Sequence, residues 1–288
     1  MLSNIKEFAD NSETLKEARI NVKEMSVVKE IGIYIALFIL MFILLFISQL
    51  IFMKISPIKD SMFFSLLGFI VVPVIIYLYV TKIEKRSWKS IGFSKGNAVS
   101  STLKGLLIGF LMFFSIVVIG MLLGQFSFDG FDLSVIIYLI PCFLLFAIQC
   151  FGEEIYTRGW TMTYFSKRHS IFFAIIVNAI IFVVPHLSNN GIDLLSIANI
   201  FIVAIFFAVL FLRFDNIWIC GGAHTAWNSA QGIILGFNVS GTSTPALLKC
   251  SQVGHNIING GAFGPESSLI ATVVIIISLI LVVYYPKK

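Results

Sequence analysis

Three short segments place ionisable and amide side chains inside otherwise apolar stretches. The first is GEEIYTRG at residues 152–159, the second is FVVPH at residues 182–186, and the third is HTAWN at residues 224–228. An ionisable side chain inside a membrane helix costs at least about 2.5–3.5 kcal/mol on insertion scales, so it normally faces the interior of the helix bundle and serves a purpose. These segments are therefore the candidates for chemistry.

The first segment contains two adjacent glutamates and an arginine. Glu154 and Arg158 are four residues apart, so on a helix they share one face and can form an ion pair. Glu153 points about 100 degrees away from Glu154 on the same helix and stays available. Two neighbouring carboxylates, of which only one is held by arginine, can differ in pKa, and such a pair suits acid–base work.

The other two segments add imidazole and amide groups. His224 and Asn228 are again four residues apart, so they line the same wall of a cavity. Glu153 lies about 16 residues before the centre of a predicted turn at 167–170 and His186 about 16 after it, which puts them at similar heights on antiparallel helices. Pro185 is expected to loosen the last helical turn and to help aim the imidazole of His186.

Hydrolysis is the chemistry that these groups could perform. Glutamate can deprotonate a water, histidine can position that water or donate a proton, and an amide N–H can hold a developing oxyanion. Alternatively, Glu153, His186 and His224 could ligate Zn²⁺ and leave one position open for water. The HExxH pattern of helical zinc proteases is absent, and no Ser/His/Asp arrangement can be assembled. His169 and His255 are expected to be ordinary loop residues.

Composition identifies the setting in which these residues work. Of the 288 residues, 58% are hydrophobic and 12% are charged, whereas soluble domains are about 45–50% apolar and about 25% charged. We therefore predict an all-α polytopic membrane protein, a helical bundle with an intramembrane active site, because helices satisfy their own backbone hydrogen bonds in lipid. About eight spans are expected, at 31–53, 62–81, 103–124, 133–151, 171–186, 196–212, 217–236 and 268–285.

The distribution of basic residues predicts the orientation of these spans. If the N-terminus is cytoplasmic, 17 Lys and Arg residues lie on the inner side and only Lys54, Lys59 and Lys249 on the outer side. Because cytoplasmic loops carry an excess of Lys and Arg, both termini are expected in the cytoplasm. The Ile-, Lys- and Asn-rich composition favours a prokaryotic cell membrane as the location.

The sequence also excludes several functional classes and suggests a division of the chain. The net charge is +5, but the basic residues are spread between apolar blocks, so nucleic acid is not an expected partner. The four cysteines show neither a disulfide framework nor zinc-ribbon spacing. We divide the chain into a cytoplasmic N-terminal segment (1–30), a three-helix membrane part (31–124) and a catalytic core with the C-terminal helices (125–288).

Taken in order, the motifs EExxxR, FxxxH and HxxxN resemble those of the CAAX-protease and bacteriocin-processing family of intramembrane proteases, also called the CPBP or Abi family. The resemblance covers residues from about 133 to 228. It implies an endopeptidase that cuts peptide bonds near the cytoplasmic leaflet. Eukaryotic members trim prenylated CAAX proteins, and bacterial relatives are linked with peptide-pheromone or bacteriocin processing and self-immunity. The implied partners are therefore the lipid bilayer and a hydrophobic or lipidated peptide or protein.

The resemblance also assigns roles to residues of this chain. It implies that Glu153 activates water, that Glu154 and Arg158 form the supporting pair, that His186 and His224 position the water or a metal, and that Asn228 is the oxyanion donor. Both a metalloendopeptidase and a glutamate-activated water without metal are compatible with it. The stretch GGAFGPE at residues 260–266 resembles one found before the last span of bacterial members, and on physical grounds it is a turn that precedes a helix.

Two other functions remain as alternatives. A catalytically silent member of the family would act as a scaffold or an immunity partner. A proton-coupled transporter could use the same buried acids, but no internal repeat supports it.

Overall fold

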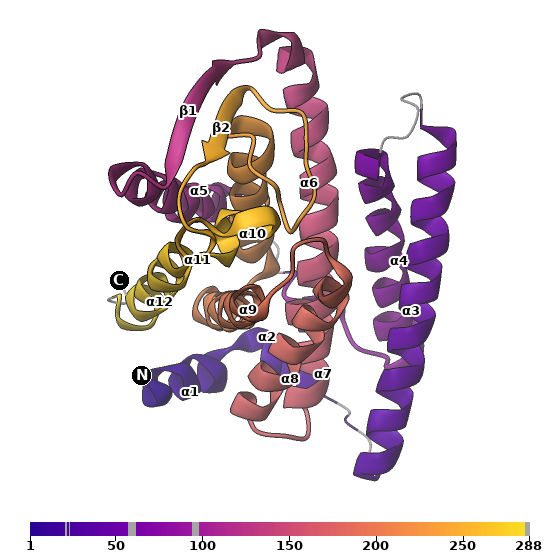
Figure 1. Ribbon diagram of the computed structural model, residues 1–288. Helices are drawn as coiled ribbons and strands as arrows, with labels where there is room; N and C mark the ends of the chain where they lie inside the picture. Colours follow the sequence, from indigo (N-terminus) through magenta and orange to yellow (C-terminus); the bar gives the residue numbers. More distant parts are fainter. Residues whose placement is uncertain (21, 23, 57–61, 94–97, 286–288) are drawn as a thin grey trace.

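The computed structural model describes residues 1–20, 22, 24–56, 62–93 and 98–285, and these fold almost entirely into helices (Figure 1). A single two-stranded ribbon, β1 (Phe126–Phe131) with β2 (Leu248–Gln252), is antiparallel with an irregularity between Phe128 and Gly130. The α-helices are α1 (Leu2–Asn11), α2 (Glu13–Arg19), α3 (Val27–Ile55), α4 (Val71–Leu78), α5 (Ala98–Leu122), α6 (Leu139–Glu154), α7 (Thr163–Ser166), α8 (Ile171–Val183), α9 (Leu194–Phe214), α10 (Ile217–Ser229), α11 (Asn256–Asn259) and α12 (Leu269–Tyr284).

Among the described residues, six helical stretches are long and apolar enough to cross a membrane. They are Val27–Ile55, Phe64–Ile83, Ala98–Leu122, Leu133–Ser166, Ile171–Ser188 and Leu194–Phe214. The apolar helix α12 is shorter, with 16 residues. The predicted all-α polytopic membrane fold is confirmed, whereas the count of eight spans is not.

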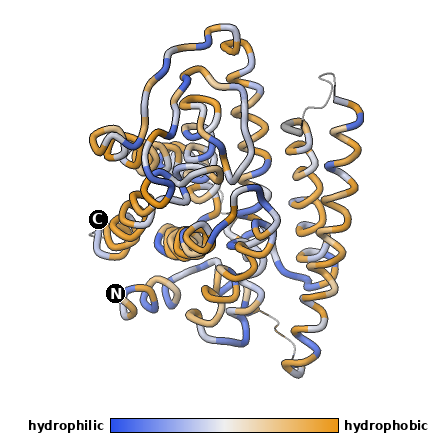
Figure 2. The backbone as a smooth tube through the Cα atoms, in the orientation of Figure 1, coloured by the Kyte–Doolittle hydropathy of each residue, from blue (hydrophilic) through white to orange (hydrophobic). Residues whose placement is uncertain are grey.

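The helix α3 shows how the apolar composition is used. It runs beside α4 (Figure 1), and hydrophobic residues follow one another along nearly its whole length (Figure 2). Of the 18 consecutive residues of α3 that are most apolar, only 11% are buried inside the protein. Its exposed side chains include Ile35, Ile43 and Phe46. Such a surface is stable only in contact with lipid, so this protein is an integral membrane protein.

The predicted turn at 167–170 is confirmed, and the turn at 215–216 resembles it, since a polar side chain caps the helix that follows each of them. Ser170 accepts a hydrogen bond from the backbone N–H of Phe173 at 3.2 Å and begins α8. Asn216 accepts from the backbone N–H of Ile219 at 3.1 Å and begins α10, directly after Asp215 at φ +51°. These caps satisfy N–H groups that the first helical turn leaves unpaired.

Glycines allow α5 and α10 to pack in direct backbone contact. A Cβ atom at Gly109 would lie 1.9 Å from the carbonyl oxygen of Ala223, and one at Gly105 would lie 2.2 Å from that of Ile219. From the other side, a Cβ at Gly222 would lie 2.4 Å from the carbonyl oxygen of Thr102. Small residues commonly bring membrane helices together in this way. The contact fixes the helix that carries the third motif.

The fourth span is longer than predicted and contains a change of helix type. Instead of ending near residue 151, α6 continues into a π-helical segment (Ile155–Met162) and then into α7. Threonine hydroxyls bond back to the chain here: Thr157 donates to the carbonyl of Glu153 and Thr163 to that of Gly159, each at 2.6 Å. Because these polar side chains are satisfied locally, the helix continues past the point where hydropathy falls. Single π turns inside helices frequently occur at functional sites.

The N-terminal segment forms two short helices and packs against the rest of the protein. Helix α1 lies beside α9 and α12 and buries Ile5 and Phe8 (Figure 1). Asp215 accepts hydrogen bonds from the hydroxyl of Ser12 and from the backbone N–H of Glu13 at 2.8 Å, so it caps the start of α2. The turn between α9 and α10 thus holds the N-terminal helices.

The turn that follows α7 is fixed by ion pairs. Glu30 at the start of α3 is buried and bonds Arg168 at 3.1 Å and Nε2 of His169 at 2.8 Å. The predicted loop position of His169 is confirmed, and its contact joins α3 to the turn. Of the basic residues used to predict the orientation, Lys23, Lys59, Lys95, Lys287 and Lys288 lie outside the described residues.

Candidate active site

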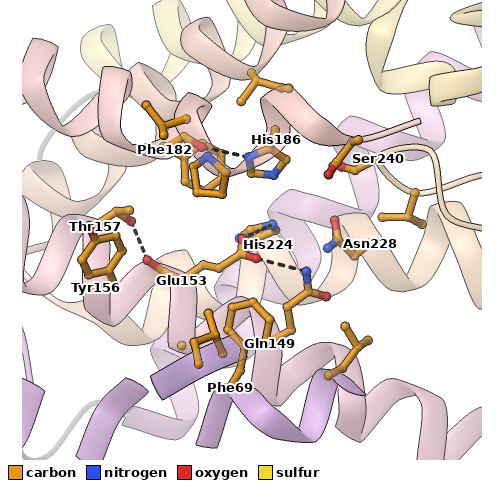
Figure 3. Close-up of a pocket in the computed structure, with 18 of the residues that line it drawn as sticks. Phe69, Gln149, Glu153, Tyr156, Thr157, Phe182, His186, His224, Asn228 and Ser240 are labelled. Atoms are coloured by element: carbon orange, nitrogen blue, oxygen red, sulfur yellow. Dashed lines mark hydrogen bonds and ion pairs between the residues drawn. The ribbon is translucent and has the colours of Figure 1, made fainter. Parts of the chain in front are cut away.

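A cavity of about 600 Å³ brings the three motifs together. Glu153, His186, His224 and Asn228 all line it, and they come from α6, from the 3₁₀ segment after α8 (Val184–Ser188) and from α10 (Figure 3). Its apolar walls come from a wider set of elements. They include Phe38, Met41, Phe42, Leu45 and Phe46 of α3, Phe69 and Val72 beside them, Phe182, Val203, Phe207 and Ile275.

Glu154 and Arg158 lie behind the cavity rather than in it. Nη1 of Arg158 is 3.0 Å from Oε1 of Glu154, and both side chains are completely buried. Nη1 also donates to the hydroxyl of Thr157, and Nη2 donates to the carbonyl oxygen of Ala204 at 3.2 Å. The predicted pair between residues i and i+4 is present, and the buried cation is compensated by both charge and hydrogen bonds.

His224 lies between the two adjacent glutamates. Its Nδ1 is 3.0 Å from Oε1 of Glu154, and its Nε2 is 3.8 Å from Oε2 of Glu153. An imidazole that donates from Nδ1 to a carboxylate presents Nε2 on the opposite side. Glu154 thereby orients His224 as well as pairing with Arg158, a second contact that the sequence did not predict.

Glu153 is the carboxylate that faces the cavity (Figure 3), with about 16% of its side chain exposed. Nε2 of Gln149, one helical turn earlier, donates to its Oε1 at 3.0 Å. This amide holds one carboxylate oxygen and leaves the other, Oε2, directed at His224. Gln149 was not among the predicted site residues, although its spacing of four from Glu153 in an apolar helix was a usable signal.

His186 and Asn228 complete the predicted set. Nδ1 of His186 donates to the carbonyl oxygen of Phe182 at 2.8 Å, which leaves its Nε2 free to act in the cavity. The helix changes from α to 3₁₀ at Val184, one residue before Pro185, as the expected loosening of the last turn requires. Nδ2 of Asn228 makes a 3.4 Å contact with the sulfur of Cys150, and its second N–H remains for another acceptor.

Two aromatic rings, those of Phe182 and Phe207, pack against the charged groups of the motifs. The guanidinium carbon of Arg158 lies 4.4 Å from the ring centroid of Phe182 and 5.1 Å from that of Phe207. The ring of Phe207 also lies 5.3 Å from that of His224. A cation over desolvated aromatic faces is held by their quadrupoles. The phenylalanine of the FxxxH motif therefore packs against the arginine of the EExxxR motif.

A second acid in the cavity, Glu266, was not predicted as a site residue. It belongs to the GGAFGPE stretch and accepts hydrogen bonds at Oε1 from the backbone N–H of Ser240 at 2.6 Å and from its hydroxyl at 2.9 Å. Burial raises the pKa of the Glu266 carboxyl above its usual value, against these hydrogen bonds, which lower it. No spacing rule connects residue 266 to the three motifs, and the resemblance of the GGAFGPE stretch was the one signal that could have pointed to it.

The arrangement of donors does not form a ready zinc site. No group of three or more His, Cys, Asp or Glu side chains is close enough to hold a metal ion anywhere in the part of the chain that the structure describes. Nδ1 of His224 is engaged by Glu154, and Oε1 of Glu153 by Gln149. These bonds leave Nε2 of His224 and Oε2 of Glu153 available, so the misfit of Glu153, His186 and His224 with Zn²⁺ rests on the spacing of the three side chains.

The facing acceptors of Glu153 and His224 suit a water molecule. When the imidazole carries its proton only on Nδ1, where it bonds Glu154, Nε2 of His224 and Oε2 of Glu153 are both acceptors. Their separation of 3.8 Å is too long for a direct hydrogen bond. A water molecule between the two atoms can donate one hydrogen bond to each of them, and it is the smallest group that can do so. Because Glu153 and His224 both line the cavity, such a water would lie in it.

Comparison with models of known protein families matches residues 135–230, about a third of the chain, to the family described as type II CAAX prenyl endopeptidase Rce1-like. The matched segment contains all three motifs. The predicted resemblance to CAAX proteases is thus confirmed over these residues. A comparison with curated proteins finds no match to this chain.

Proposed function

We propose that this chain, whose residues 135–230 match the Rce1-like family of type II CAAX prenyl endopeptidases, is an intramembrane endopeptidase in which Glu153 activates the attacking water. Glu154 orients His224, and Arg158 neutralises Glu154. His186 acts from the opposite side of the cavity, and Asn228 supplies an N–H to the oxyanion. The observation that carries this proposal is the 3.8 Å approach of Oε2 of Glu153 to Nε2 of His224.

The proposed reaction moves one proton from the water to Glu153 and then from Glu153 to the departing nitrogen. Glu153 removes a proton from the water as its oxygen bonds to the carbonyl carbon of the substrate, and the negative charge moves to the carbonyl oxygen. Asn228 donates a hydrogen bond to that oxygen. The protonated Glu153 then gives its proton to the departing nitrogen as the C–N bond breaks. The products are a carboxylic acid and an amine, and Glu153 returns to its starting state.

The walls of the cavity suggest the class of substrate. Apart from the motif residues they are mainly Phe, Met, Leu, Val and Ile side chains from α3, α4, α8 and α9. A mainly apolar site with a few polar groups takes an apolar chain and orients it by those groups. We propose a hydrophobic or lipidated peptide, or the tail of a membrane protein, as substrate. A peptide pheromone or a bacteriocin precursor is the most specific form of this proposal.

The test is cleavage of a membrane-anchored reporter by purified protein in proteoliposomes. Glu153→Gln keeps the size of the side chain and an acceptor for Gln149 but removes the base, so cleavage is expected to fall by at least about 10²-fold. Insertion and thermal stability should stay at wild-type levels. Glu13→Gln, at an exposed carboxylate of α2, is the matched control and should cleave normally. Full cleavage by Glu153→Gln would remove the proposal.

A chelator separates the two routes to an activated water. Cleavage that persists after exhaustive chelation supports glutamate activation without metal. Loss of cleavage that Zn²⁺ restores would instead assign a metal to Glu153, His186 and His224, and would require these side chains to rearrange.

A further inference from the structure

The cavity wall carries negative charge wherever its carboxyl groups ionise, because none of its described lining residues is Lys or Arg. Its carboxyl and imidazole groups belong to Glu153, Glu266, His186 and His224. Two of the four are carboxylates, and the imidazoles are neutral when each donates from Nδ1 and leaves Nε2 unprotonated.

Arg158, the cation of the EExxxR motif, does not offset this charge. Its side chain is completely buried, and Glu154, also completely buried, neutralises it at 3.0 Å. The rings of Phe182 and Phe207 cover its guanidinium group. When both carboxyl groups are ionised and the imidazoles are neutral, two negative charges on the wall have no cationic partner. Burial, which raises the pKa of Glu266, makes a cationic partner for its carboxylate more favourable.

Glu266 is held so that part of its carboxylate stays available. Both hydrogen bonds from Ser240 go to Oε1, whereas Oε2 has only a 3.4 Å contact with Nε1 of Trp227. Ser240 has φ +48°, a left-handed conformation that non-glycine residues adopt rarely and that its bonds to Glu266 stabilise. Figure 3 shows Ser240 on the same side of the cavity as His186 and Asn228. Glu266 thus belongs to the wall that faces a bound peptide.

We propose that this cavity selects its peptide by charge, with Glu266 as the specificity-determining residue. The cavity accepts apolar segments with a Lys or Arg side chain beside the cleaved bond. It disfavours segments with Asp, Glu or a free C-terminal carboxylate at that position. Like charges brought together in a desolvated site repel strongly, whereas a cation gains a partner. The cleavage part of this inference rests on the proposed function, whereas the charge preference in binding does not.

The test uses quenched fluorescent peptides built from apolar residues, with one Lys, Gln or Glu placed at each successive position. The purified full chain is assayed in detergent with chelator present, so that no added metal ion neutralises the carboxylates. Next to the cleaved bond, kcat/KM should be highest for Lys, and the ratio of Lys to Glu should be about tenfold or more. A ratio of one or less at every position would overturn the proposal.

Two variants assign the preference to Glu266. Glu266→Gln keeps an acceptor for Ser240 and removes the charge, so the Lys-to-Glu ratio should fall by about tenfold. Ser240→Ala removes one hydrogen bond to Glu266 and keeps the charge, so its ratio should stay near that of the wild type. An unchanged ratio in Glu266→Gln, or an equal fall in both variants, would show that Glu266 does not set the preference by its charge.

Binding separates this inference from the proposed function. Fluorescence anisotropy of the same peptides with the wild-type protein gives the Kd for each charge, whether or not cleavage occurs. Tighter binding of the Lys peptides without any cleavage would support the charge preference and contradict the protease. Cleavage with equal Kd and equal kcat/KM for Lys and Glu peptides would support the protease and contradict the charge preference.

Discussion

Oε1 of Glu154 bonds Nη1 of Arg158 and Nδ1 of His224, each at a distance of 3.0 Å. His224 lies 70 residues further along the chain. One carboxylate oxygen therefore joins two of the three motifs. Nδ1 of His224 bonds Glu154, and its Nε2 lies 3.8 Å from Oε2 of Glu153. The two glutamates thus have different tasks: Glu154 orients and Glu153 faces the cavity.

The buried pair predicts a large loss of stability when only one partner is removed. Glu154→Ala leaves the guanidinium of Arg158 buried without a counter-charge, and breaking such a pair costs about 3–5 kcal/mol in free energy of unfolding. Thermal unfolding in detergent measures this loss. The control is Glu13→Ala, which removes an exposed ion pair with Lys16 and should cost at most about 1 kcal/mol. Equal losses for the two variants would mean that Glu154 is not a buried partner.

Asn228→Ala tests the proposed oxyanion donor. Removing one such donor lowers kcat by about 10²–10³-fold, while KM should change little because the bond to the oxyanion forms during the reaction. Steady-state kinetics on a cleaved reporter measure both constants. A rise in KM with unchanged kcat would place Asn228 in substrate binding instead.

The contact between α5 and α10 predicts that a single methyl group disrupts the site. Gly109→Ala puts a Cβ atom against the carbonyl oxygen of Ala223, so α10 must move and shift His224 and Asn228. Both cleavage and stability should fall, and thermal unfolding and reporter cleavage measure the two effects. Gly32→Ala in α3 meets nothing within 4 Å and is the matched control. It should be neutral or stabilising by up to about 1 kcal/mol.

The cap at Asp215 predicts that the N-terminal helices can be released by one substitution. Asp215→Ala removes the acceptor for Ser12 and Glu13, a loss of about 0.5–2 kcal/mol. Limited trypsin digestion should then cut at Lys16 and Arg19 faster than in the wild type. Asp10→Ala, at an exposed residue of α1, should leave the rate unchanged. No acceleration in Asp215→Ala would show that other contacts hold the segment.

The orientation predicted from basic residues is tested by labelling single cysteines in a background without the four native ones. A cysteine at Ser3 in α1 should react with an impermeant maleimide only after the membrane is opened, because cytoplasmic loops carry the excess of Lys and Arg. A cysteine at Ser127 in β1 should react in intact cells. The opposite pattern would reverse the orientation.

The sequence predicted the parts of the site that depend on local spacing. Glu154 and Arg158, or His224 and Asn228, are one helical turn apart, and helical geometry alone puts each pair on one face. The turns at 167–170 and 215–216 were predictable from breaks in the apolar pattern, and the structure has helices ending and beginning there.

The remaining features depend on contacts between distant segments, which spacing does not encode. Glu266 reaches the cavity through a loop whose path is set by glycines with positive φ, such as Gly260 and Gly264. The fourth span exceeded its predicted end because threonine hydroxyls satisfy its polar region from within. The second contact of Glu154, with His224, could not be foreseen without the relative placement of α6 and α10.

The cavity is built from residues as far apart as Phe38 in α3 and Ile275 in α12, although the family match covers only residues 135–230. During synthesis, the ribosome releases the motif residues well before the last part of the wall. In a nascent chain, the motif residues therefore have no complete enclosure until Ile275 has emerged and packed against them.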